Sequence, residues 1–218
     1  MTTPIFEDNH LLILNKPAGL LTQPSGTGQD SLEQQAKAYI KELKQKSGNV
    51  FLEAVHRLDK PVSGIVVFAK SSKALSRLNQ AMRNKQVRKI YWAIVEGVVS
   101  SDEGSLEHYL VHDDFHAKVV EACHPEGKKA ILHFKVLQRT KNKTMIEIEL
   151  ATGRYHQIRL QLSASGHPIL GDHKYSSKLA YEGMGIALHH RQLQLTHPVT
   201  QQLMMFEALP PSSFLTLE

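Results

Sequence analysis

The chain has 218 residues, 41% apolar and 22% charged, with a formal net charge of +5. This composition provides enough apolar side chains for a core and excludes a disordered or fibrous chain. The sequence has no apolar run long enough for a membrane helix, and its first ten residues lack an apolar signal core. Because the single cysteine, Cys123, excludes an internal disulfide, we expect a cytoplasmic protein.

The first half of the chain predicts two helices among strands. A capping box of Asp30 and Glu33 opens a helix that is predicted to end at Gly48. Ser71 or Ser72 caps a second helix, whose apolar residues recur at helical spacing. Runs of β-branched and aromatic residues predict strands at Leu11–Asn15, Gly64–Lys70 and Ile90–Gly97.

The second half predicts a hairpin, a short helix and two closing strands. The hairpin joins Ile131–Arg139 to Thr144–Ala151, and helical spacing returns over His156–Ser165. Late strands are expected at Ala187–Leu195 and Gln202–Ala208. Because strands and helices mix without βαβ alternation, we predict an α+β fold with a mixed, mainly antiparallel central sheet flanked by helices. We also expect one domain over residues 1–218, with Ser100–Gly104 as a loop.

Basic residues are concentrated in one segment. No acidic residue lies between Asp59 and Glu96, whereas eight basic ones do: Lys60, Lys70, Lys73, Arg77, Arg83, Lys85, Arg88 and Lys89. Such a segment produces a local positive field that attracts phosphate backbones. An equally good interpretation is a solvated helix face whose charge is balanced by acids on neighbouring elements.

Two polar clusters next to proline or glycine are candidate sites. In His56–Asp59, which precedes a Pro/Gly loop and an apolar strand, a carboxylate is well placed to face a cleft. The alternative is a turn aspartate paired with a nearby arginine. In the segment 152–159, His156 and Arg159 are three residues apart and Tyr155 and Arg159 four apart, so on a helix they share a face. An arginine there suits a carboxylate or a phosphate, or is part of an exposed polar helix start.

A third cluster, Arg88–Tyr91, places a tyrosine beside basic residues. Such a tyrosine either stacks on a nucleobase or is half-buried in the core. The 13 histidines raise the question of a metal site, but they form neither an HExxH nor a zinc-finger spacing. The sequence also lacks the phosphate-binding, dinucleotide and serine-hydrolase glycine motifs, which disfavours those three chemistries.

Taken in order, these segments resemble the RluA-type pseudouridine synthases over most of the chain. The motifs are NKPAG, HRLDKPVSG, RKIY leading into WAIVEG, TGRYHQIR, GHPILGDHKY and LHHRQLQLTHP, at residues 15–19, 56–64, 88–97, 152–159, 166–175 and 188–198. Any one of these motifs can arise by chance, but the set in the right order and at the right separations forms a specific signal. Because few residues precede the LLILN strand, we expect the catalytic domain alone, without an S4-like RNA-binding module.

The resemblance implies an isomerase that converts uridine in large-subunit rRNA or tRNA to pseudouridine without metal or cofactor. It implies that Asp59 is the catalytic aspartate, Tyr91 the tyrosine that stacks on the target base, and Arg159 the arginine that pairs with the aspartate. We also expect contacts to RNA from His56, Arg57, Lys89, Arg154 and His156. A monomer that binds an RNA stem-loop, and neither DNA nor a membrane, is expected.

Two residues depart from the family pattern. Val62 stands where a threonine is common, and Gln161 where a histidine often lies. Neither removes an expected catalytic group, so we expect effects on loop packing or RNA contacts. The alternative functions are a non-catalytic RNA-binding module of the same fold and a histidine-dependent metallohydrolase.

Overall fold

The computed structural model describes residues 4–45 and 47–214. By its contacts the chain divides into two compact units. Unit 1 consists of Met1–Arg88 and His190–Leu209, and unit 2 of Lys89–His189 and Pro210–Glu218. The single-domain expectation stays a prediction.

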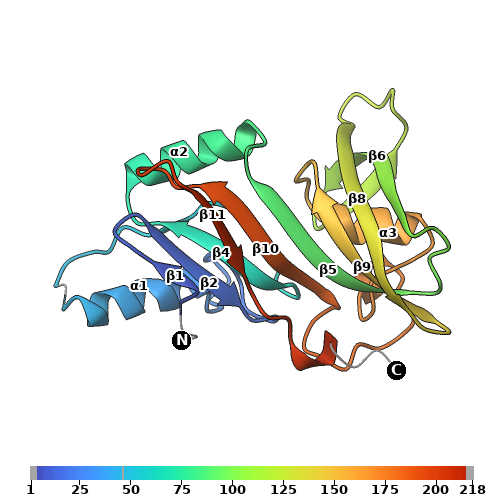
Figure 1. The fold of residues 1–218 in the computed structure, drawn as a ribbon, viewed down its shortest axis with the longest axis horizontal. Helices are drawn as coiled ribbons and strands as arrows, with labels where there is room; N and C mark the ends of the chain where they lie inside the picture. Colours follow the sequence, from blue (N-terminus) through green and yellow to red (C-terminus); the bar gives the residue numbers. More distant parts are fainter. Residues whose placement is uncertain (1–3, 46, 215–218) are drawn as a thin grey trace. The chain divides into compact units, whose positions relative to one another are not determined.

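The strands of unit 1 form a sheet in the order β1-β2-β4-β10-β11, with β3 beside β4. The pairs β1–β2, β2–β4, β3–β4 and β10–β11 are antiparallel. Every residue of β4 is buried, as expected for a strand whose two faces are both covered. Figure 1 shows α1 and α2 on opposite sides of these strands. The bounds of the strands are β1 Phe6–Glu7, β2 Leu11–Lys16, β3 Glu53–Ala54, β4 Ser63–Ala69, β10 Leu188–Thr196 and β11 Leu203–Glu207.

Helix α1 spans Leu32–Leu43, so the predicted helix end at Gly48 was wrong. The predicted cap was wrong by one residue, because Ser31 and not Asp30 is the N-cap. The Ser31 hydroxyl accepts a hydrogen bond from the Gln34 backbone N–H at 3.3 Å and donates one to the Gln34 side chain at 2.8 Å. The pair Ser31–Gln34 therefore takes the place of the predicted box, and Glu33 instead forms an ion pair with Lys37.

Helix α2 spans Ser72–Arg83 and is capped by Ser71, one of the two predicted caps. Its Ala74 and Leu78 pack into a core with side chains of β2, β4, β10 and β11. The predicted basic face is exposed: Lys73, Arg77 and Arg83 all reach solvent. The Arg77 guanidinium also donates to the Pro198 carbonyl at 2.6 Å.

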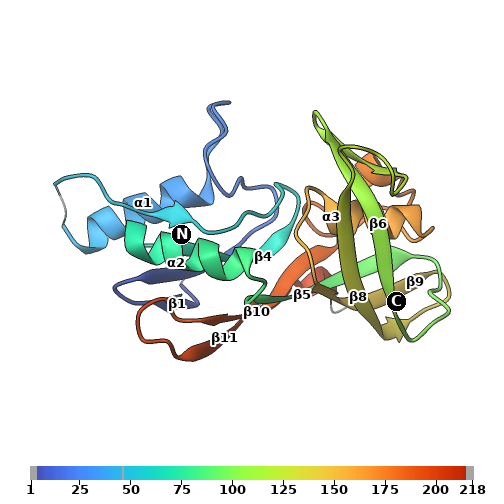
Figure 2. The ribbon, with the colours of Figure 1, turned by 90° about the horizontal axis from the view of Figure 1, so that it is seen from above.

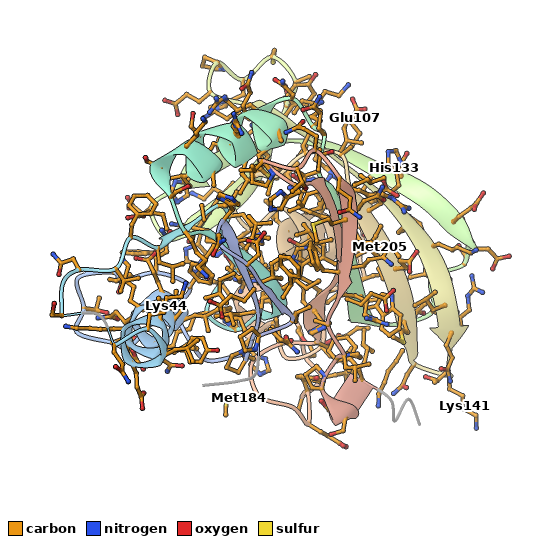
Figure 3. All side chains as sticks on the ribbon, turned by 60° about the vertical axis from the view of Figure 1, so that its left-hand side comes forward. Lys44, Glu107, His133, Lys141, Met184 and Met205 are labelled. Carbon is orange, nitrogen blue, oxygen red and sulfur yellow. The ribbon has the colours of Figure 1, made fainter. Side chains whose placement is uncertain are left out.

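The strands of unit 2 follow the order β5-β9-β8-β6-β7, and their printed pairs are all antiparallel. Prediction missed the β6–β7 hairpin, because β6 is mostly exposed and lacks a continuous apolar face. Glu107 on β6 and His133 on β8 project outward (Figure 3). The bounds are β5 Arg88–Glu96, β6 Glu103–Asp113, β7 His116–Val120, β8 Lys128–Arg139 and β9 Lys143–Leu150.

Helix α3, Gln157–Ala164, starts one residue later than predicted and packs against β6 and β7 (Figure 2). Two short 3-10 helices, His173–Tyr175 and Ser212–Phe214, lie in the same unit. The predicted α+β class, with a mainly antiparallel sheet and flanking helices, is confirmed. Within the described residues, no helix is long and apolar enough to cross a membrane.

Candidate active site

Asp59 lies in unit 1, on the loop that leads into β4, and this loop is anchored before the aspartate by Thr22. The Thr22 hydroxyl donates to the Leu58 carbonyl at 2.9 Å and accepts from the Leu58 N–H at 3.1 Å. The Asp59 carbonyl then accepts from the Val62 N–H at 3.0 Å and closes a turn. These bonds fix the backbone that carries the carboxylate, which is itself partly exposed.

The loop is anchored after Asp59 by Lys16, the last residue of β2. Lys16 is fully buried, and its ammonium donates to the carbonyls of Leu20, Pro17 and Lys60 at 2.7, 3.0 and 3.3 Å. The Lys60 carbonyl also accepts from the Gly19 N–H at 2.7 Å. Burial lowers the pKa of Lys16 to about 8, while the nearby Asp59 carboxylate acts in the opposite direction. A cation is thus enclosed close to the candidate catalytic carboxylate.

His56 and Arg57 precede Asp59 and differ in their surroundings. His56 is partly buried, and its Nε2 accepts the Val67 N–H of β4 at 3.3 Å. Its ring also meets that of His190 edge-on, with centroids 5.5 Å apart. Arg57 is exposed to solvent. Of the two, Arg57 has the accessible side chain that a contact with RNA requires.

Arg159 lies in unit 2, on α3, where its guanidinium grips a carboxylate of the same unit. Its Nε and Nη2 donate to the two oxygens of Asp172, each at 2.7 Å. Asp172 is 1% exposed and Arg159 5% exposed, and the guanidinium lies 5.1 Å from the centre of the Tyr175 ring. A bidentate pair of this kind fixes the plane of an arginine as well as its charge.

His156 completes the cluster around Arg159. Its Nε2 lies 3.1 Å from Arg159 Nη1, and its Nδ1 lies 2.7 Å from the Tyr175 hydroxyl. Because an arginine only donates, Nε2 accepts and the proton of the neutral ring is on Nδ1. Burial, and then the charge of Arg159, lower the pKa of His156 to about 3. His156 is the N-cap of α3 with a left-handed backbone, φ 50°. The predicted proximity of His156 and Arg159 is confirmed, whereas Tyr155 precedes the helix and does not share its face.

The neutral His156 makes a prediction for acid stability. Its folded-state pKa is below the value in an unfolded chain, so the unfolded state takes up the proton first and stability is lost as the pH falls from about 6.5 towards 3. Between pH 7 and 4.5, the unfolding free energy of the wild type should fall by about 2 kcal/mol more than that of His156→Asn. Asparagine is chosen because it tolerates the left-handed backbone at this position. Urea unfolding at several pH values measures this difference. The exposed His133→Asn is the control, and equal slopes in wild type and His156→Asn would contradict the assignment.

The other expected site residues of unit 2 lie on β5 and in the loop before α3. Tyr91 is 6% exposed and faces Ile148 of β9 across the strand pair. Lys89 Nζ lies 3.6 Å from where a Cβ on Gly153 would be, and burial lowers the pKa of its amine. Arg154 is exposed, and its Nε donates to the Lys129 carbonyl at 3.1 Å. Lys89 and the Gly153–Arg154 loop are thereby neighbours.

The two departures from the family pattern are packing residues. Val62 is buried in the turn after Asp59. Gln161 is fully buried, and its amide donates to the carbonyls of Leu106 and Ala130 at 3.0 and 3.2 Å. It therefore ties α3 to β6 and β8. Across residues 4–45 and 47–214, no three His, Cys, Asp or Glu side chains gather as a metal site.

Solved structures share this fold. The human RNA Pseudouridylate Synthase Domain Containing 4 superposes with a TM-score of 0.81 at 28% identity, covering 97% of this chain and 90% of that one. The human RNA Pseudouridylate Synthase Domain Containing 1 is 19% identical and shares the fold, with a TM-score of 0.78 over 96% of this chain and 83% of its own. The fold is therefore that of the pseudouridine synthases.

Sequence comparison identifies the family within the pseudouridine synthases. A family model described as RNA pseudouridylate synthase matches residues 10–164. The dual-specificity RNA pseudouridine synthase RluA of Haemophilus influenzae is 38% identical over 206 residues, 94% of this chain and 91% of the relative. The RNA pseudouridine synthase YhcT of Bacillus subtilis is 37% identical over 217 residues, 98% of this chain and 70% of the relative. This chain belongs to the RluA-type family of RNA pseudouridine synthases, which are isomerases.

Sequence reasoning did not assign a role to four residues that build these surroundings: Lys16, Thr22, Asp172 and Tyr175. Lys16 and Asp172 lie within quoted motifs, but a motif does not show which atoms its charges meet. Thr22 lies outside the quoted motifs, 36 residues from its partner Leu58. A charged residue next to a proline or glycine in an otherwise apolar segment was the available signal for Lys16 and Asp172.

Proposed function

We propose that this enzyme isomerises uridines in large-subunit rRNA, tRNA or both, with Asp59 as its catalytic carboxylate. The observation that carries the assignment is the Asp59 loop, which is fixed on one side by Thr22 and on the other by the buried Lys16. A carboxylate held on a rigid loop has the orientation that catalysis needs. The relatives support the substrate class, since besides the dual-specificity RluA they include a ribosomal large subunit pseudouridine synthase of Vibrio vulnificus.

The reaction cuts the N-glycosidic bond, turns the uracil and joins C5 to C1′, so reactant and product are isomers. Bond cleavage leaves positive character at C1′, which a carboxylate stabilises or traps as a covalent adduct. A second route has the same carboxylate remove a sugar proton and form a glycal. Both routes require an ionised carboxylate.

Tyr91 and Arg159 take the roles that the family resemblance implies. Tyr91 stacks on the target base and is the candidate group, directly or through water, that takes the proton left on C5 after rejoining. The resemblance implies that Arg159 also pairs with the catalytic aspartate. The supporting observation in unit 2 is that Asp172, His156 and Tyr175 hold the Arg159 guanidinium in one orientation.

RNA binding extracts the target uridine from its stack, at a cost of about a few kcal/mol that is smallest in loops and bulges. Arg57, exposed beside Asp59, fills the space that the uracil leaves. Phosphates contact the exposed face of α2 and the basic residues near it, so affinity should fall with salt at a log–log slope of about −0.7 per phosphate on single strands. The enzyme is proposed to act as a cytoplasmic monomer and to select RNA over DNA through the 2′-hydroxyl.

Tritium release tests the substrate class. RNA labelled with 5-³H-uridine loses the label when C5 forms its bond to C1′. We expect release from unmodified tRNA, from unmodified large-subunit rRNA or from both, and none from either RNA when the enzyme carries Asp59→Asn. Salt-sensitive binding without release from any fraction would contradict the proposal and favour the non-catalytic RNA-binding alternative.

A further inference from the structure

Unit 2 has a pocket of about 580 Å³ that the assigned catalytic residues do not line. The end of β6, the β7–β8 loop, the start of β8 and the loop before α3 form its walls, and Leu110 and Val111 contribute apolar surface. The volume lies in the range of sites for small ligands. The polar residues around it are His112, Glu126, Lys128 and Arg154.

A row of three aromatic rings begins in this pocket and ends at the Arg159 cluster. The ring of His112, an exposed residue, lies 4.2 Å from the Tyr155 ring, tilted by 55°. Tyr155 in turn stacks on His156 at 3.9 Å and 19°. Because His156 is buried and Tyr155 already contacts both other rings, the exposed His112 is the ring that can receive another aromatic group. A base stacked there would extend the row.

Two basic residues, Lys128 and Arg154, line the same pocket as the His112 ring. Lys128 is exposed, and within the described part of the chain its side-chain ammonium has no hydrogen bond or ion pair. Arg154 is held by its Nε on the Lys129 carbonyl and by its backbone N–H on Gln157, at 3.1 and 3.0 Å. This leaves the two terminal nitrogens of its guanidinium for a ligand. Phosphate oxygens are the natural acceptors for such a pair.

Glu126 restricts the kinds of ligand that the pocket can bind. A carboxylate beside Lys128 and Arg154 disfavours a run of phosphates, whereas it accepts well from the N–H or amino group of a base. One nucleotide, with its base turned into the pocket and its phosphate at the rim, satisfies both the cations and the carboxylate. We propose that this pocket binds a single unstacked nucleotide of the substrate RNA, distinct from the isomerised uridine, with its base on His112 and its phosphate on Lys128 and Arg154.

The inference rests on the proposed RNA substrates and names a second recognition point on them. The pocket would bind an unpaired nucleotide near the target uridine, and proteins commonly select sites in folded RNA through such unpaired nucleotides. The aromatic row also joins this nucleotide to Arg159 through His156. We therefore expect occupancy of the pocket to favour RNAs with an unpaired residue close to the target uridine.

Filter binding of unmodified tRNA and large-subunit rRNA transcripts tests the pocket. His112→Ala should weaken binding of the preferred RNA about tenfold, in line with about 1–3 kcal/mol per stacked base. His112→Phe should restore most of it, because the ring is kept. Lys128→Ala should weaken binding and reduce the salt slope by about 0.7. Lys135→Ala on the same strand removes the same charge outside the pocket and should bind within about twofold of wild type.

The proposal is overturned if His112→Ala and Lys128→Ala bind like wild type, or if His112→Phe is as weak as His112→Ala. These outcomes are distinct from a failure of the proposed function, because binding is measured apart from turnover. Wild-type tritium release together with unchanged binding of the variants would remove the pocket only. Pocket-dependent binding without release would remove the catalytic proposal and leave the pocket in place.

Discussion

Asp59→Asn is expected to fold and bind RNA like the wild type and to form pseudouridine at least about a thousandfold more slowly, as when a covalent or charge-stabilising catalytic group is lost. The amide keeps the size of the side chain but carries no negative charge and is a poor nucleophile. Neither cleavage route then has its carboxylate. The rate of tritium release under single-turnover conditions measures the loss.

The loop geometry explains why this variant should stay folded. Thr22, Lys16 and Gly19 bond to the backbone of Leu58 and Lys60, and none of these bonds uses the Asp59 carboxylate. The variant does remove a negative charge near the buried Lys16, so a small change in stability is expected. Asp102→Asn is the matched control, since its carboxylate is 87% exposed and pairs with Arg139. Turnover by Asp59→Asn at the rate of that control would remove Asp59 from its role.

Arg159→Lys is expected to lower the isomerisation rate by at least about a hundredfold, while RNA affinity changes by less than about threefold. Lysine keeps the positive charge but loses the fork that meets both oxygens of Asp172. It also loses the donor to His156. The loss should appear in the single-turnover rate at saturating RNA, with RNA affinity from filter binding as the second readout.

We expect Asp172 to act as a positioning residue for Arg159, and a second variant separates this role from folding. Asp172→Asn keeps the shape of the side chain and should lower the rate less than Arg159→Lys does. In the double variant the two losses should not add, because both act through one guanidinium. Arg139→Lys, at an exposed ion pair of the same unit, is the control. A folded Arg159→Lys with the wild-type rate, or fully additive losses, would contradict this role of the cluster.

The sequence predicted most regular elements of the fold, because their patterns are local. Apolar runs identified β2, β4 and β5, and helical spacing identified α1 and α2. Two overlapping caps stand at the start of α1, Asp30 with Glu33 and Ser31 with Gln34. Local pattern does not choose between them, whereas the structure places Glu33 on the buried side of the helix and Ser31 at its cap. The β6–β7 hairpin was missed because exposed polar residues interrupt its alternation.

The sequence predicted which residues belong to the candidate site, but it did not predict most of the contacts that hold them. Motifs carried by family resemblance pointed to Asp59 and Arg159, and their roles stay predictions. Their supporting partners are distant in the chain: Lys16 bonds to a carbonyl 44 residues away, and Arg159 to a carboxylate 13 residues away. Such contacts depend on how loops close, and one sequence holds no local signal for them. For the same reason the sequence did not indicate the aromatic row from His112 to His156.

Nucleoside analysis of RNA after incubation with the purified enzyme tests the central claim most directly. Digestion and chromatography of unmodified tRNA and large-subunit rRNA should show pseudouridine rising by the amount that uridine falls, with no uracil released. The same RNA treated with Asp59→Asn should keep all its uridine. Bound but unchanged RNA, free uracil in the digest, or equal conversion by Asp59→Asn would contradict an Asp59-dependent uridine isomerase.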